Sequence, residues 1–201
     1  MDPQVEKALA KWPNVPHCYG WLALDARGNW RMRDAKAQQQ GLPGEHLAPS
    51  ALTAFINRNY GHDELGRWYF QNGPQRVYVD LEAAPHVARL EPDATLRLHT
   101  GAALPRIGAA WLSDRGRIWL QGYLQGDELV ALLDDRDLAP LLSRLHADGQ
   151  PATEAQLMAW LDRDATVELT LDWSRMLPVG RLLEETAASR FGFVRVPRGE
   201  R

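Results

Sequence analysis

The sequence predicts an α+β protein made of two similar tandem modules, each a mainly antiparallel sheet with a helix packed on one face. Three observations support this prediction. Short stretches alternate apolar and polar residues between turn-forming residues, as half-buried strands do. Capped amphipathic helices lie between these stretches, and the two halves of the chain resemble each other. The chain has 201 residues, 45% of them hydrophobic, which is enough to bury a core.

In the first half, Asp2 is expected to cap a short helix over residues 3–11. A hairpin follows, because residues 19–25 and 30–33 alternate around a turn-forming stretch. Ser50 is then expected to cap an amphipathic helix that ends near residue 60. Alternation predicts further strands at 67–71, 76–82, 86–90 and 95–99.

In the second half, residues 110–121 predict another hairpin. Aspartates at the start of 127–133 and 137–146 are expected to cap helices. Thr153 and Gln156 form a capping box before a third helix. The C-terminal segments are strands at 167–171 and 193–196, with 181–190 between them fitting helix and strand equally well.

An internal repeat is the main prediction about domain organisation. Residues 21–30 match 111–119, residues 52–59 match 157–164, and residues 77–82 match 167–172 in type and order. The offsets between these matches are not constant, so compensating insertions are needed. The expected N-terminal α+β module is 1–100 and the C-terminal one is 101–201.

Composition excludes several classes of protein. The 23 basic and 26 acidic residues leave a net charge of −3, which gives no field to attract nucleic acid or an anionic membrane. One cysteine rules out an internal disulfide, and no apolar run is long enough to span a membrane. The first residues lack the apolar stretch of a signal peptide. We therefore expect a cytoplasmic protein without nucleic-acid or membrane partners and with unknown oligomeric state.

No familiar catalytic or cofactor motif occurs in the chain. Glycine-rich phosphate loops, a serine nucleophile elbow and paired cysteine or histidine metal motifs are all missing. We expect no cofactor and no bound metal.

The densest group of reactive side chains is expected in the turn after the helix that Ser50 caps. His62, Asp63 and Glu64 could act on a substrate, while Arg58 and Arg67 could hold an anion. A solvated acidic turn, with Arg58 paired to an acid such as Asp63, would explain the same residues.

Two other features could bind a ligand. Asp80 and Glu82 share one predicted strand face beside Tyr78, at a spacing found for paired carboxylates, although any half-exposed strand shows such a face. Most of the eight tryptophans fall at predicted core positions in helices and hairpins. Trp173 follows a strand end, and it is the ring that we expect to be free for binding.

A longer block resembles a family of uncharacterised bacterial proteins of about 200 residues, known only as domains of unknown function. The resemblance is carried by LTAFINRNYGHDELGRWYFQ (residues 52–71) and VYVDLEAAPHVARL (residues 77–90). It covers roughly residues 20–100. The resemblance implies a two-module α+β fold, and it implies no activity and no catalytic residues.

The resulting functional hypothesis is a non-enzymatic, regulatory module that binds a small ligand or a protein partner. Its motivation is two sheet-and-helix modules with many aromatic residues and no assembled catalytic set. The alternative is an enzyme of the hydrolase type, with its site at the His62–Arg67 turn. RNA binding through aromatic sheet faces is a third hypothesis, which the negative net charge opposes.

Overall fold

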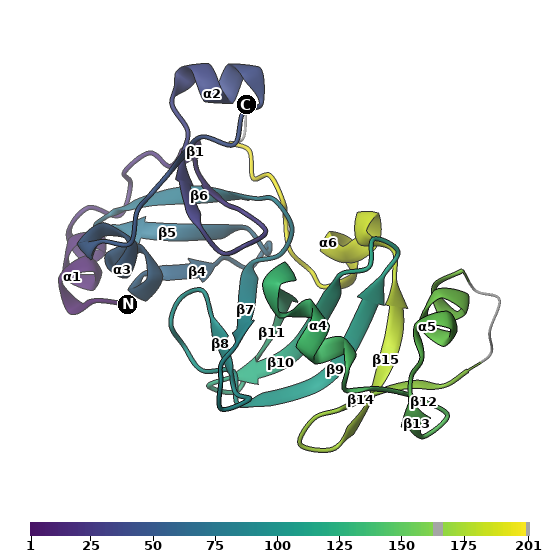
Figure 1. The fold of residues 1–201 in the computed structure, drawn as a ribbon. Coiled ribbons are helices and arrows are strands. Elements are labelled where there is room, and N and C mark those ends of the chain that lie inside the picture. The colour runs from purple at the N-terminus through teal and green to yellow at the C-terminus, as the bar shows by residue number, and fades with distance from the viewer. Residues whose placement is uncertain (163–166, 200–201) are drawn as a thin grey trace. The chain divides into compact units, whose positions relative to one another are not determined.

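The computed structural model describes residues 1–162 and 167–199, and over these the chain is α+β, as predicted (Figure 1). Two compact units are present. The first contains residues up to Pro85, His99–Gly101 and the segment that begins at Ala188, and the second contains His86–Leu98 and Ala102–Ala187. That residues 1–100 and 101–201 form separate domains stays a prediction.

The described part of the first unit forms a six-stranded mixed sheet with strand order β3-β2-β1-β6-β5-β4. Its strands are β1 (Cys18–Leu24), β2 (Trp30–Met32), β3 (Glu45–His46), β4 (Tyr60–His62), β5 (Trp68–Asn72) and β6 (Gln75–Leu81). Its helices are α1 (Pro3–Lys11), α2 (Ala35–Gln40), α3 (Ala51–Arg58) and α6 (Ala187–Arg190), the last of which begins at the final residue of the second unit. β1 and β6 are parallel, and the other neighbours are antiparallel.

Local sequence explains the elements of the first unit that were predicted correctly. The β1–β2 turn closes because Asp25 Oδ1 accepts hydrogen bonds from the amides of Arg27 and Asn29. Ser50 caps α3 by accepting from the Thr53 amide. α3 then packs on the sheet, where the ring of Phe55 meets that of Phe70 of β5 edge to face at 5.5 Å. Figure 1 shows α3 beside β5 and α2 beside β1.

β6 is buried on both faces, which differs from the predicted polar face of this strand. Tyr78 is fully buried and Asp80 is only 7% exposed. The reason is position, because β6 lies between β1 and β5 in the middle of the sheet. Glu82, just beyond the strand, is exposed as expected.

The described part of the second unit forms a nine-stranded mixed sheet with order β13-β12-β14-β15-β9-β10-β11-β7-β8. Its strands are β7 (His86–Leu90), β8 (Leu96–Leu98), β9 (Arg106–Ser113), β10 (Ile118–Leu124), β11 (Asp127–Leu133), β12 (Leu145–Ala147), β13 (Gln150–Pro151), β14 (Leu169–Asp172) and β15 (Met176–Leu182). Its helices are η1 (Asp135–Asp137), α4 (Leu138–Leu142), α5 (Glu154–Leu161) and η2 (Glu184–Thr186).

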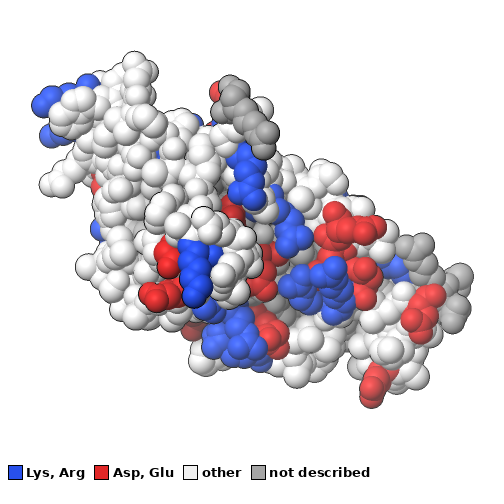
Figure 2. Space-filling view, turned by 90° about the horizontal axis from the view of Figure 1, so that it is seen from above, with Lys and Arg blue, Asp and Glu red and all other residues white. Residues whose placement is uncertain are grey.

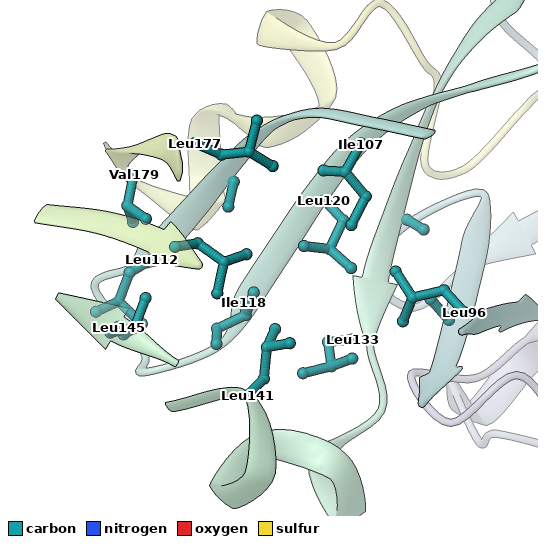
Figure 3. Packing of buried hydrophobic residues seen from close by; sticks show 14 of the residues in the cluster. Leu96, Ile107, Leu112, Ile118, Leu120, Leu133, Leu141, Leu145, Leu177 and Val179 are labelled. Carbon is teal, nitrogen blue, oxygen red and sulfur yellow. The ribbon is translucent and has the colours of Figure 1, made fainter. Parts of the chain in front are cut away.

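The core of the second unit is aliphatic and lies on one face of this sheet (Figure 3). Leu112, Leu120 and Leu177 point into it from three neighbouring strands, and Leu141 of α4 closes it. These side chains are at most 2% exposed. Their burial supplies the hydrophobic stabilisation of the unit.

Four predicted elements of the second half differ in the structure. Residues 137–146, expected to form one helix, contain the short helix α4 and the start of β12 at Leu145. Residues 127–133 form β11 instead of a helix, because this apolar stretch is inserted between β10 and β7. Residues 181–190 contain the end of β15, then η2 and α6. Residues 193–196 form only an isolated bridge, between Val194 and Arg67 of the first unit.

The two sheets share an order of five strands. The run β2-β1-β6-β5-β4 in the first corresponds to β10-β9-β15-β14-β12 in the second, with the same parallel and antiparallel neighbours. In this correspondence β15 takes the place of β6, whereas the sequence match had chosen 167–172. Residues 163 and 164 of the match 157–164 lie outside the described residues. The duplication itself stays a prediction.

The tryptophans are less uniformly buried than predicted. Trp30, Trp119 and Trp160 are at most 6% exposed, but Trp12 and Trp21 are about half exposed, at 51% and 47%. Trp12 is the residue that ends α1, so it lies beyond the apolar stripe. Trp21 alternates with buried Leu22, and the pleat of β1 therefore turns it outward.

Candidate functional site

The predicted turn at residues 62–67 is organised around one carboxylate. Asp63 Oδ1 accepts from the amides of Leu65 and Arg67, and Oδ2 accepts from Arg67 Nε at 2.8 Å and from the Tyr78 hydroxyl at 3.0 Å. Burial raises the pKa of Asp63, but these hydrogen bonds outweigh it and leave that pKa below its ordinary value. Both oxygens are thus used to hold the turn.

Arg67 contacts the carboxylate of Asp63, but the side chains of His62, Glu64 and Arg58 do not. His62 and Glu64 are exposed, and the ring of His62 contacts that of Trp68 at a tilt of 47°, with the ring centroids 4.8 Å apart. Arg58 forms an ion pair with Asp2 at 3.3 Å. The alternative of a solvated acidic turn had suggested Asp63 as its partner. Ligand binding by this group stays a prediction, as does a hydrolase site built on it.

Trp173 lies at the tip of the β14–β15 hairpin. Its ring is partly buried against the core of the second unit, and the Arg144 guanidinium lies over it at 5.0 Å. The ring is therefore less free than expected. Its role in ligand binding stays a prediction.

A pocket of about 300 Å³ lies in the first unit, over the face of β2, β1 and β6. The pairing register of β1 with β2 and β6 explains why the surface is hollow at this place. Ala23 of β1 is flanked by Arg31 of β2 and by Asp80 of β6, so a methyl group lies between two long or charged side chains. The loop at Leu42 and Pro43, together with Val196, completes the walls, as the lining of the pocket includes all three.

Two ion pairs supply the polar part of the pocket. Arg33 NH1 lies 2.5 Å from Asp80 Oδ2, and Arg31 lies 2.9 Å from Asp25 Oδ2. The side chains of Arg33 and Asp80 are only 15% and 10% exposed. Arg33 Nε and Asp80 Oδ1 are buried and have no hydrogen-bond partner among the described residues.

The two aspartates of the pocket have opposite electrostatic environments. Burial raises the pKa of Asp80 above its ordinary value, and the positive charges of Arg33 and Arg198 offset this only in part. Burial also acts on Asp25, but hydrogen bonds from Asn29 and Arg31 leave its pKa lowered. Carboxyl groups whose pKa values are shifted by burial and by specific hydrogen bonds are common in functional sites.

The comparisons with known proteins bear on the identity of the chain. A family model described as "Protein of unknown function (DUF2946)" matches residues 1–198. The chain belongs to this family. The resemblance inferred from residues 52–71 and 77–90, to a family known only as a domain of unknown function, is thereby confirmed. None of the curated proteins matches the chain.

Two solved structures of DUF1285 family proteins are similar to this member of the DUF2946 family. One, from Silicibacter pomeroyi DSS-3, has 15% identity and a TM-score of 0.48, with 89% of this chain and 94% of that one covered. The other, from Shewanella baltica OS155, has 16% identity and a TM-score of 0.41, with 60% and 88% covered.

Two kinds of feature are absent from the described residues of this family member. No helix there is both long and apolar enough to cross a membrane. Nor do three or more histidine, cysteine or acidic side chains gather there in a way that could hold a metal ion. On the face shown in Figure 2, basic and acidic side chains lie next to one another and do not form a patch of one sign.

Sequence reasoning noticed part of the pocket and missed the rest. Asp80 and Glu82 stood out by their alternation, but Arg31 and Arg33 did not. A signal was present, since these two arginines alternate with Met32 along the predicted hairpin. What could not be foreseen is the parallel pairing of β1 with β6, which places Asp80 beside Ala23.

Proposed function

We propose that this protein is a non-enzymatic module that binds a small ligand in the pocket of the first unit. The observation that carries the proposal is the row Arg31–Ala23–Asp80 across three strands, which leaves a hollow between charged side chains. Ligand pockets combine apolar walls with a few convergent polar groups. This pocket has such walls at Leu42 and Pro43, and its volume is at the lower end of the usual range.

Binding is favoured over catalysis because the two aspartates of the pocket are already hydrogen-bonded within the protein. Asp80 is paired with Arg33, and Asp25 is held by Arg31 and Asn29, so each carboxylate already has a hydrogen-bond donor. Such a set can orient a ligand that has a polar end and an apolar part. The hydrolase alternative has less support, because both oxygens of Asp63 are occupied.

In a second form of the proposal, the module binds a protein partner in place of a small molecule. The net charge of −3 argues against nucleic acid and anionic membranes as partners.

A thermal-shift screen tests the proposal. Nucleotides, amino acids, amines, organic acids and sugars are each added to the wild-type chain. A ligand present at a hundred times its Kd adds about 2.7 kcal/mol. For a chain of this size we therefore expect a rise in Tm of roughly 5–10 °C.

The matched variants are Ala23→Leu and Ala155→Leu. Ala23→Leu fills the pocket between Arg31 and Asp80, so the shift should vanish. Ala155→Leu adds the same side chain to an exposed position of α5 in the second unit, so the shift should remain. The proposal is wrong if no compound class shifts the wild-type Tm, or if Ala23→Leu responds as the wild type does.

A further inference from the structure

A second hollow, of about 410 Å³, lies in the second unit on β9, β10 and β11. Its floor is made by Gly108 and Ala109 of β9, which have almost no side chain. The register between β9 and β10 shifts here, since Gln121 pairs with Ala109 and Gly122 pairs with Ile107. Gly108 is thus the extra residue of a β-bulge, a feature that often lies beside functional sites.

A side chain at Gly108 would crowd the ring of Tyr123. A Cβ atom there would lie 3.3 Å from Cε2 of Tyr123. The hairpin tip with Ser174 and Arg175 forms a further wall of the hollow. The hollow is therefore built by backbone geometry and small residues.

Two arginines line this hollow without an acidic partner. Arg106 lies over the Tyr123 ring, 5.3 Å from its centroid, and neither Arg106 nor Arg175 makes an ion pair with any described residue. The one acid in the lining, Glu128, is engaged by two uncharged side chains of the same lining. Its Oε1 accepts from Gln121 Nε2 at 2.7 Å and from the Tyr123 hydroxyl at 3.4 Å.

We propose that this hollow binds the oxyanion group, carboxylate or phosphate, of a small molecule. The charges of Arg106 and Arg175 less that of Glu128 give the lining a net charge of +1. Guanidinium groups match the geometry of carboxylate and phosphate oxygens. The hydroxyl of Ser174 supplies a further donor. This site is separate from the pocket of the first unit, and neither proposal depends on the other.

An NMR titration of the full chain tests the site, with inorganic phosphate and acetate as separate probes at low ionic strength. We expect saturable shifts of the backbone amide signals of Gly108, Ala109 and Ser174, which weaken with added salt. The probe that saturates at the lower concentration identifies the oxyanion. Shifts that are spread over the surface or that do not saturate with either probe would overturn the proposal.

Variants make the test specific. Arg106→Ala and Arg175→Ala should each weaken binding about tenfold, since a hydrogen bond to a charged group is lost. Glu128→Gln should tighten binding roughly two- to fivefold, because a like charge is removed. The control is Arg115→Ala, at the turn end of the same β9–β10 hairpin, which should bind as the wild type does.

The pocket of the first unit supplies a control for this hollow. Ala109→Leu should abolish binding of the probe, whereas Ala23→Leu should leave it unchanged. Each variant's own spectrum shows whether it is folded. Unchanged affinity in both arginine variants, or in a folded Ala109→Leu, contradicts the assignment.

Discussion

The buried pair of Arg33 and Asp80 gives the sharpest prediction about stability. Arg33→Met keeps the length of the side chain but removes its charge. Asp80 is 7% exposed, its Oδ1 already has no partner, and Oδ2 would lose the donor that lies 2.5 Å away. Breaking a buried pair by removing one partner costs about 3–5 kcal/mol. For a chain of this size, Tm should fall by on the order of 10 °C.

The cost should depend on pH with a definite sign. The folded-state pKa of Asp80 is raised, so its ionisation removes stability as pH rises from the ordinary pKa of 3.8 through the folded value. Without Arg33 the folded pKa rises further. The deficit of Arg33→Met is therefore largest near neutral pH and shrinks as pH falls toward about 4.

Urea unfolding of four chains measures this prediction: wild type, Arg33→Met, Asp80→Asn and the double variant. The double variant should lose less stability than Arg33→Met, because no uncompensated charge stays buried. A loss below about 1 kcal/mol in Arg33→Met, or a loss that does not change with pH, would refute the reasoning.

Three further predictions concern single positions. Gly180→Ala should cost about 1–3 kcal/mol in thermal denaturation, because its Cβ would lie 2.2 Å from ring atoms of Trp111, and an unchanged Tm would contradict this. Leu120→Ala should cost about 2–5 kcal/mol in urea unfolding, because Leu120 is fully buried, whereas a loss comparable to that of a surface substitution would not fit. Asp63→Ala should cost about 1–3 kcal/mol at neutral pH, because the turn loses its hydrogen bonds. The pKa of Asp63 is lowered, so this contribution is present above the ordinary 3.8 and is lost as pH falls through the folded value; acid unfolding that is the same in both chains would argue against it.

The elements that were predicted correctly have local causes. Ser50 caps α3, and Thr153 and Gln156 form the capping box of α5, through hydrogen bonds that span three residues. The β1–β2 turn is closed by Asp25 within five residues. Interactions of this range can be identified from neighbouring residue types alone.

The errors come from position within a sheet. Residues 127–133 begin with an aspartate and are apolar, a pattern that fits a helix as well as a strand with both faces buried. Only the neighbours β10 and β7 make this segment a strand. The same reason explains why the sequence matches 77–82 to 167–172 whereas strand order aligns β6 with β15, since alternating strands look alike wherever they lie in the sheet.

The candidate sites also differ in whether their residues are close together in the sequence or are brought together only by the fold. The turn at His62–Arg67 is contiguous in sequence, so it was found, and Asp63 proves to hold it together. The pocket of the first unit joins Arg33 to Asp80, which are 47 positions apart. The hollow of the second unit depends on a β-bulge at Gly108, for which the sequence offers one weak signal, a glycine inside a strand.

The sequence by itself determined the α+β class, the hairpin turns, the caps of α3 and α5 and the membership of a family, because these depend on residue types close together in the chain. Asp2 and Asp137 were also expected to cap helices, but their side chains make no capping hydrogen bond. The tertiary structure alone decided which strands are parallel, that Asp80 is buried beside Arg33, and that Ala23 and Ala109 lie at the floors of two hollows. Strand order and register determine which side chains become neighbours, and they are set by the packing of the whole sheet.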